Sequence, residues 1–349
     1  MRRGLAFLSE GRPAAGDYGS RLARLRWLRA VGEEGAVIAD WGAGEPAAAV
    51  VREAESWVLV PDAEALPFAL PRGAAHTLRE LESGPARPDE EGSTSPVAFR
   101  PAELPPAEGE TVELYIKRLY NARPAGFEIL PSCSVGDPSA KERPEVVDRL
   151  PAGACRILDP GCGSGGLALA RARRPAWKLT GIENDPIRAA RARETRGYER
   201  ILEGDIVDVV PALSAEGARF DVLVFADVLE HFEDPVPILA AARSVVEHGG
   251  LLLVVAPNVG HLSLVRDLLL GRHDPVPAGL CDWGHLRWFS KSFLAETIEE
   301  AGWHLEKIEG IPGAAPPDPE PFLALARSWP EADLESLATY QWIATARNR

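Results

Sequence analysis

The second part of the chain alternates short apolar runs with segments of helical periodicity. Runs that are apolar throughout are typical of parallel strands buried on both faces. Strands are expected at 156–159, 178–183, 200–203, 221–226, 251–256, 303–309 and 339–346. Helices are expected between or beside them at 165–173, 186–195, 208–213, 235–247 and 291–301. This order predicts an α/β fold, a Rossmann-like, doubly wound, mostly parallel seven-stranded sheet.

The first 82 residues show a shorter version of the same alternation and predict a small α/β N-terminal module. Its expected elements are a helix at 17–30, a strand at 36–41, a helix at 45–55 and a strand at 57–60. A Pro-rich stretch at 83–110 is interpreted as a linker. Residues 111–150 form a helical lead-in, with helices at 112–120 and 143–150. The large domain spans 151–349 and includes an insert at 258–290. A second Pro-rich stretch, 312–321, predicts a surface loop.

Composition limits the classes of protein to which the chain can belong. The chain has 349 residues, 46% of them hydrophobic, with a formal net charge of −14. Acidic residues outnumber basic ones in both 1–150 and 151–349, which disfavours nucleic acid as a partner. The longest apolar run, Leu251–Pro257, is too short to span a bilayer. The four cysteines form no CxxC pair, so they are interpreted as free thiols, and we expect a cytoplasmic protein.

The strongest chemical signal follows the first strand of the large domain. Residues 158–166 read LDPGCGSGG and stand between that strand and a helix. Glycines permit a tight turn and let a ligand approach the backbone near the positive end of the helix. A GxGxxG spacing alone fits a dinucleotide fold equally well. Asp159 precedes the first glycine by two positions, where it can reach a cationic or hydrogen-bond-donating ligand group.

Two further acidic residues lie at the ends of neighbouring strands. Glu183 ends the second strand, where its carboxylate can accept from both hydroxyls of a ribose. Asp205 follows the third strand and can accept an adenine amino proton, while Ile206 can pack on the ring. The carboxyl ends of parallel strands meet at one edge of the sheet. No nearby Lys or Arg offers a clamp for a pyrophosphate, although backbone amides alone can bind one. These residues predict a site for a nucleoside without phosphates.

With these residues in place, the sequence from about 142 to 349 resembles class I S-adenosylmethionine-dependent methyltransferases. It is similar to bacterial ubiquinone-biosynthesis-type O-methyltransferases and to methyltransferases found with glycan-assembly enzymes. The motifs are specific for this superfamily and say little about the substrate. The resemblance rests on LDPGCGSGG at 158–166, GIENDP at 181–186, GDI at 204–206, FDVLVFADVLEHFEDP at 220–235 and GGLLLVVAPN at 249–258.

The resemblance implies S-adenosylmethionine as the cofactor and assigns positions around it. Glu183 would bind the ribose, and Asp205 and Ile206 would border the adenine. Ala226 and Asp227 would lie beside the sulfonium and the acceptor. The methionine part would be bordered by Asp159, Gly161, Gly163 and Gly165.

Methyl transfer is an in-line displacement at an activated carbon, so the enzyme mainly needs positioning and a dry site. An oxygen or nitrogen acceptor also benefits from a base. Asp227 and His231 stand at i and i+4 and would share one face of a helical turn. His231 can take the acceptor proton. The alternative is that His231 is a structural residue that orients the cofactor loop.

The insert at 258–290 can cover the carboxyl ends of the strands as a lid. Its aromatic residues would exclude water, and His285 or Arg287 would contact acceptor oxygens. Alternatively, the aromatic residues are core and the histidines are exposed. His261, His273 and His285 stand 12 positions apart, a spacing that matches no common zinc pattern, so no metal is expected.

The sequence therefore favours a methyltransferase that acts on a small-molecule or saccharide-type acceptor at oxygen. One alternative is an NAD(P)-dependent oxidoreductase, which explains the glycines and Glu183 but leaves Asp159 and Asp205 without a role. Another is a non-catalytic, methyltransferase-like binding subunit. The sequence leaves open whether the chain forms a homodimer.

Overall fold

The computed structural model divides the chain into two compact units. The first comprises Met1–Gly136 with His273–Trp283, and the second comprises Asp137–Arg272 with Gly284–Arg349. The structure describes residues 138–349 apart from 154, 274, 277–278, 314 and 317–318. Before 138 it describes short strands and a few residues near 47 and 101–110. The helices expected at 17–30 and 112–120 lie outside the described residues, and the helix expected at 45–55 is described at one helical residue, Ala47.

The first unit contains a mixed five-stranded sheet in the order β2–β1–β3–β5–β6. β1 is parallel to β2 and β3, whereas β5 is antiparallel to β3 and β6. The strands expected at 36–41 and 57–60 are confirmed as β2 and β3. β5 and a 3-10 turn, η2, lie inside the range expected to be a linker, because a three-residue apolar run is too short a signal among prolines. The bounds are β1 Arg3–Ser9, β2 Val37–Gly42, β3 Ser56–Val60, β5 Val97–Phe99, η2 Pro101–Glu103 and β6 Glu128–Ile129, with a separate pair β4 Leu66–Pro67 and β7 Ser132–Cys133.

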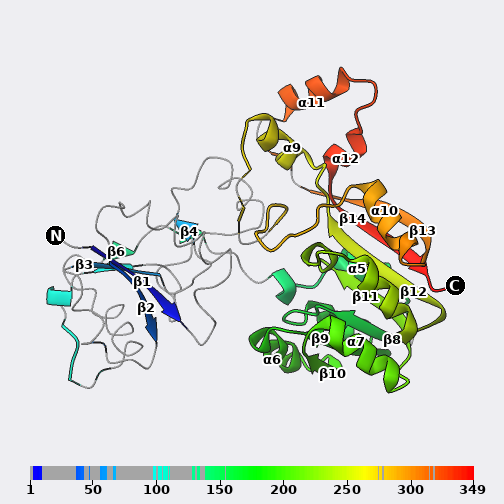
Figure 1. Ribbon diagram of the computed structural model, residues 1–349, viewed down its shortest axis with the longest axis horizontal. Helices are drawn as coiled ribbons and strands as arrows, with labels where there is room; N and C mark the ends of the chain where they lie inside the picture. The colour runs from blue at the N-terminus through cyan, green and yellow to red at the C-terminus, as the bar shows by residue number, and fades with distance from the viewer. Residues whose placement is uncertain are drawn as a thin grey trace. The chain divides into compact units, whose positions relative to one another are not determined.

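The second unit is built on a seven-stranded sheet in the order β10–β9–β8–β11–β12–β14–β13 (Figure 1). β14 is antiparallel to both of its neighbours, and the other adjacent strands are parallel. The predicted mostly parallel seven-stranded sheet is therefore confirmed. The strands are β8 Cys155–Pro160, β9 Trp177–Glu183, β10 Tyr198–Glu203, β11 Phe220–Ala226, β12 Val246–Pro257, β13 His304–Pro312 and β14 Thr339–Arg347.

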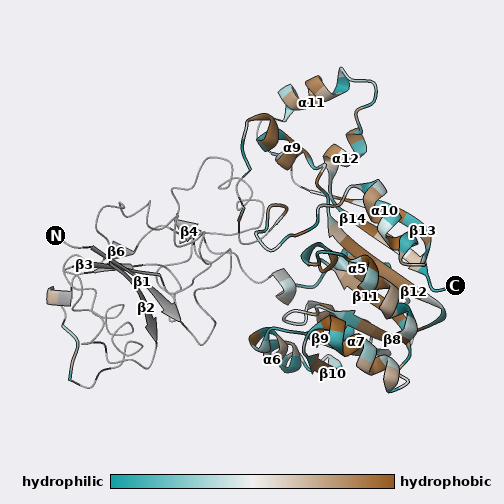
Figure 2. Cartoon of the chain, viewed as in Figure 1, coloured by the Kyte–Doolittle hydropathy of each residue, from teal (hydrophilic) through white to brown (hydrophobic). Residues whose placement is uncertain are grey.

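Helices cover both faces of this sheet, and its central strands β11 and β12 are strongly apolar (Figure 2). α7 Ile206–Ala215, α8 Val236–Ala242 and α10 Lys291–Glu300 bury their apolar sides against one face. On the other face lie α5 Pro144–Val147 and the 3-10 helix η4 Gly166–Ala172. α6 Pro186–Glu194 begins at Asp185, whose carboxylate accepts from the Ile187 and Arg188 amides as an N-cap.

Three expected helices differ from the structure. The helix expected at 143–150 is the short α5 Pro144–Val147. The segment after the glycine-rich turn is the 3-10 helix η4 rather than an α-helix. The helix expected at 235–247 ends at Ala242, followed by η6 Arg243–Val245, and β12 begins at Val246. Val246 is 3% exposed and pairs with Phe220 of β11. Strand pairing and burial therefore override the helical periodicity at this point.

Part of the insert forms α9 Leu262–Leu269, which contacts α12 Leu334–Ala338. The Arg266 guanidinium of α9 lies over the ring of Phe322 in α11 Glu320–Arg327, at 5.6 Å from its centroid. α9, α11 and α12 thus lie side by side beyond one end of the sheet (Figure 1). Among the described residues, no helix is long and apolar enough to cross a membrane.

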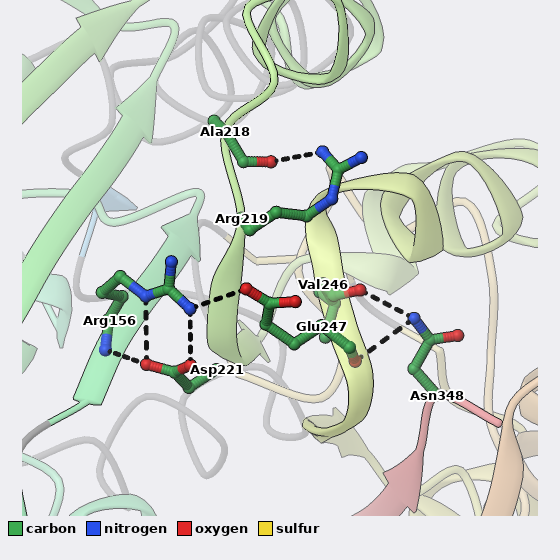
Figure 3. Close-up of polar contacts among 7 residues, drawn as sticks. All are labelled: Arg156, Ala218, Arg219, Asp221, Val246, Glu247 and Asn348. Carbon is green, nitrogen blue, oxygen red and sulfur yellow. Dashed lines mark hydrogen bonds and ion pairs between the residues drawn. The ribbon is translucent and has the colours of Figure 1, made fainter.

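The amino ends of three adjacent strands are tied together by charged side chains (Figure 3). Arg156 of β8 contacts Asp221 of β11 at 2.7 Å and Glu247 of β12 at 2.9 Å. The Asn348 side-chain amide donates to the Val246 carbonyl at 2.8 Å, so the end of the chain joins the same edge. The residues predicted to bind ligands lie at the opposite, carboxyl edge.

Candidate functional site

The glycine-rich turn begins where β8 ends. The amides of Gly161 and Cys162 donate to the Ile182 carbonyl at 2.8 and 3.0 Å. Gly161, Gly163 and Gly165 all have positive φ, a backbone conformation that other residues rarely adopt. A Cβ on Gly163 would lie 2.2 Å from the Cβ of Ser139, so a larger residue does not fit there.

A segment preceding the large domain covers this turn. Ser139, in the 3-10 turn η3 Pro138–Ala140, accepts a hydrogen bond from the Ser164 amide at 2.9 Å. A Cβ on Gly166 would lie 2.2 Å from the Lys141 carbonyl oxygen, which shows how close the segment runs. Sequence reasoning missed Ser139, because no local pattern indicates that residues 25 positions apart meet.

Glu183 links the end of β9 to the glycine-rich turn. Its Oε2 accepts from the Gly163 amide at 2.8 Å, and its Oε1 accepts from the Asp185 amide at 2.9 Å. The side chain is buried, with 5% of the residue exposed. A carboxylate has about four lone-pair sites, so each oxygen can accept a further hydrogen bond. Glu183 can therefore hold the turn and receive two ligand hydroxyls.

Asp205 and Ile206 lie next to Glu183, because the Gly204 amide donates to the Glu183 carbonyl at 3.0 Å. Asp205 is exposed and caps α7 by accepting from the Val207 amide at 3.0 Å. Ile206 is 9% exposed and belongs to the core between α7 and the sheet. The structure thus brings the predicted ribose and adenine residues together at one edge of the sheet.

Asp159 lies at the end of β8, and its carboxyl faces Tyr198. The Tyr198 hydroxyl donates to Asp159 Oδ2 at 2.5 Å, and 5% of Asp159 is exposed. Burial raises the pKa of Asp159 to about 7, although the Tyr198 hydrogen bond acts in the opposite direction; the charge of Glu183 adds to the rise. Tyr198 was not among the predicted residues.

This shift predicts that Asp159 makes the stability of the protein depend on pH. The folded protein holds this proton up to about pH 7, whereas the unfolded chain releases it near its ordinary pKa of about 4. Protonated Asp159 therefore contributes to the free energy of unfolding at low pH, and this contribution is lost as the pH rises toward 7. Asp159→Asn removes this titration. Between about pH 5 and pH 8 the free energy of unfolding should therefore fall by on the order of 3 kcal/mol more in the wild type than in the variant.

Urea unfolding at the two pH values measures this difference. Asp208→Asn, which changes an exposed carboxyl in α7, is the matched control and should run parallel to the wild type. Parallel curves for Asp159→Asn as well would contradict the raised pKa.

Asp227 follows Ala226, the last residue of β11, and has a left-handed backbone with φ of 56°. This conformation breaks the helical turn that the spacing of Asp227 and His231 predicted, so that prediction is wrong. The Asp227 carboxylate accepts from Arg143 Nη1 and, at 2.6 Å, from Gln341 Nε2. Arg143 Nη2 also donates to Gln341 Oε1 at 2.9 Å. Sequence reasoning missed both Arg143 and Gln341.

His231 ends the 3-10 turn η5 Leu229–His231 and is accessible to solvent. Its Nδ1 lies 3.0 Å from the Gly284 carbonyl, which can only accept, so Nδ1 carries the proton and Nε2 is an acceptor. Partial burial of the ring lowers the pKa of His231, although Gly284 and Asp227 act in the opposite direction. A neutral imidazole with an unprotonated Nε2 can serve as a base near neutral pH.

His285 lies beside His231, with ring centroids 5.1 Å apart. Its Nε2 is 3.9 Å from Oε1 of Glu230, a fully buried residue. The ligand atoms of Glu230, His231 and His285 all lie within 4.8 Å of one another, a donor set that can hold a divalent cation. The expectation of no metal rested on the spacing of His261, His273 and His285 and did not include Glu230 or His231; it stays a prediction.

The other residues singled out in the insert lie in different environments. His261 is 1% exposed and caps α9, and its burial lowers its pKa to about 4, so it stays neutral. His273 belongs to the segment grouped with the first unit. Arg287 Nη1 donates to the Leu286 carbonyl at 2.9 Å. Phe289 is fully buried and stacks on Phe293, as core residues do.

A family model described as a methyltransferase domain matches residues 119–308. The ubiquinone biosynthesis O-methyltransferase of Xylella fastidiosa (strain 9a5c) is 30% identical over 207 residues, which is 55% of this chain and 76% of that protein. The protein of the same name from Neisseria meningitidis serogroup C is 29% identical over 163 residues. That match spans 45% of this chain and 66% of the Neisseria protein.

A solved structure that resembles the chain is a SAM-dependent methyltransferase from Archaeoglobus fulgidus. It shares 16% identity and a TM-score of 0.43, and the match covers 59% of this chain and 91% of that one. A putative methyltransferase from Bacillus halodurans C-125 shares 19% identity with a TM-score of 0.38, over 58% and 96% of the two chains.

Proposed function

The chain belongs to the methyltransferase domain family, and we propose that it methylates an oxygen atom of a small-molecule acceptor. It is a class I S-adenosylmethionine-dependent methyltransferase, with S-adenosylmethionine as the methyl donor. The relatives named O-methyltransferases support oxygen as the acceptor atom. The proposal for this site depends on the hydrogen bond between His231 Nδ1 and the Gly284 carbonyl, which leaves Nε2 as an acceptor in the turn that follows β11.

The residues at the carboxyl edge fit the methyl donor chemically. Glu183 retains lone pairs for two ribose hydroxyls while it holds the glycine-rich turn. Asp205 is exposed and can accept from an adenine amino group. Bound S-adenosylmethionine supplies a methyl carbon activated by a sulfonium. We propose that Glu183 binds the ribose, that Asp205 and Ile206 border the adenine, and that the methionine part follows Asp159, Gly161, Gly163 and Gly165.

The remaining chemistry belongs to the acceptor side. An acceptor hydroxyl must lose its proton as it attacks, and a neutral histidine is suited to take it near pH 7. The proton would pass to Nε2 of His231, while the Gly284 carbonyl holds Nδ1 and the charge of Asp227 stabilises the imidazolium that forms. His285, 5.1 Å from His231, would contact the acceptor oxygen.

Calorimetric titration of the purified 349-residue chain tests the identity of the methyl donor. We expect S-adenosylmethionine to bind with a micromolar dissociation constant, and NADH at the same concentrations to give no heat of binding. The physical reason is that the acidic residues at the strand ends accept from hydroxyl and amino groups and would repel a pyrophosphate. Binding of NADH with equal affinity would instead favour the oxidoreductase alternative.

An acceptor screen tests the transfer. The protein is incubated with methyl-labelled S-adenosylmethionine and a panel of phenols, free sugars and amines. Label on a hydroxyl compound is expected, and label on amines alone would contradict oxygen as the acceptor atom. Donor binding without transfer to any panel member would favour the non-catalytic alternative. The saccharide-type acceptor, the homodimer and the cytoplasmic location stay predictions.

A further inference from the structure

Three polar side chains from distant parts of the sequence form a closed ring at the end of β11. Asp227 accepts from Arg143 and from Gln341 Nε2, and Gln341 Oε1 accepts from Arg143 Nη2. Arg143 also donates from Nε to Glu145 at 2.7 Å, which fixes the guanidinium plane. Each member of the ring is therefore held by the other two.

The ring holds a strained piece of backbone. A left-handed conformation costs free energy for a residue with a Cβ, so it persists where surrounding contacts impose it. The Asp227 amide donates to the Val255 carbonyl at 3.1 Å, and the ring engages both carboxylate oxygens. Asp227 is thus fixed at both its backbone and its side chain. Val228, the next residue, is the N-cap of the turn that ends at His231.

We propose that Gln341 and Arg143 are positioning residues for methyl transfer, and that they act by holding Asp227 so that His231 faces the acceptor. This inference rests on the proposed function of His231 as the base. Asp227 holds the turn through its two accepting oxygens, its charge stabilises the imidazolium of His231, and it does not itself take a proton. Gln341 reaches the site from β14, whose backbone pairs with Pro257 at the end of β12.

The hydrogen-bonding pattern of the ring allows a reversal test. The amide of Gln341 donates to Asp227 with one atom and accepts from Arg143 with the other. Exchanging the amide and the carboxylate keeps all three hydrogen bonds and the total charge. Gln341→Glu alone places two carboxylates against each other, and Asp227→Asn alone places two donors against each other. The double variant Asp227→Asn/Gln341→Glu restores the pattern.

We expect each single variant to lower kcat by about tenfold or more, because loss of a hydrogen bond to a charged group misplaces the catalytic turn. The double variant should return to within about threefold of the wild type. The KM for S-adenosylmethionine should change by less than about threefold in all three, since Glu183 and Asp205 are unaltered. Thr345→Ala, on the same strand as Gln341, is the control and should leave kcat unchanged.

A second readout does not depend on turnover. In protein labelled with 15N-histidine, the Nδ1 proton that His231 donates to Gly284 should give an imidazole N–H signal that is protected from exchange. Its absence in His231→Asn assigns it. The signal should weaken or shift in each single variant and return in the double variant. The proposal is overturned if the single variants keep both kcat and the imidazole N–H signal, or if the double variant is as impaired as the single variants. If the imidazole signal returns in the double variant but the protein shows no turnover, the positioning role stands and the proposed function is rejected.

Discussion

Replacing His231 by asparagine should lower kcat by about 10²- to 10³-fold, the range in which positioned bases contribute to catalysis. An asparagine amide can still donate to the Gly284 carbonyl, so the turn is retained, but it cannot take a proton. The affinity for S-adenosylmethionine should stay within about threefold, because the proposed donor contacts lie on other strands. Steady-state kinetics on the acceptor found in the screen measures the effect.

The pH profile adds a second line of evidence on His231. The base must be neutral to act, so kcat of the wild type should fall as the pH drops through the lowered pKa of His231 and should level off above it. The variant should lose this limb. His248→Asn, at an exposed position on the amino side of the sheet, is the matched control and should keep the wild-type profile. Unchanged kcat and profile in His231→Asn would instead assign His231 the structural role of orienting the cofactor loop.

Glu183→Ala should raise the dissociation constant for S-adenosylmethionine by about 100-fold or more. The substitution removes the acceptor for the ribose hydroxyls, and it leaves the buried Gly163 and Asp185 amides without their partner. Each unsatisfied donor costs about 1–3 kcal/mol, so the free energy of unfolding should fall as well. Calorimetric titration and urea unfolding on the same preparation measure the two effects.

Glu183→Gln separates binding from folding. The glutamine side chain offers one accepting oxygen, so it can retain one of the two backbone hydrogen bonds and should lie between alanine and the wild type in both measurements. Glu194→Ala, at an exposed position in α6, is the control and should change neither. Wild-type affinity in Glu183→Ala would show that the ribose assignment is wrong.

Much of the fold could be predicted because its cause is local. The four inner parallel strands, β8, β9, β11 and β12, are largely apolar, since they are buried on both faces, and this pattern is visible in the sequence. The start of α6 at Pro186 is likewise predicted from the sequence, whereas α7 begins at Ile206, two residues before its expected start. The end of α8 could not be predicted, because Val246 leaves the helical pattern only through its pairing with Phe220 in a distant strand.

The fold class, the glycine-rich turn and the carboxylates at the ends of four strands could be predicted from the sequence, because these depend on patterns within a few residues. The groups that those carboxylates contact became visible in the folded chain. Asp159 meets Tyr198 across 39 positions, and Asp227 meets Arg143 and Gln341 across 84 and 114. His231 and His285 likewise become neighbours through the fold. Such contacts arise where the fold brings strands and loops from distant parts of the chain together, and the spacing of residues along the chain does not indicate which of them will meet.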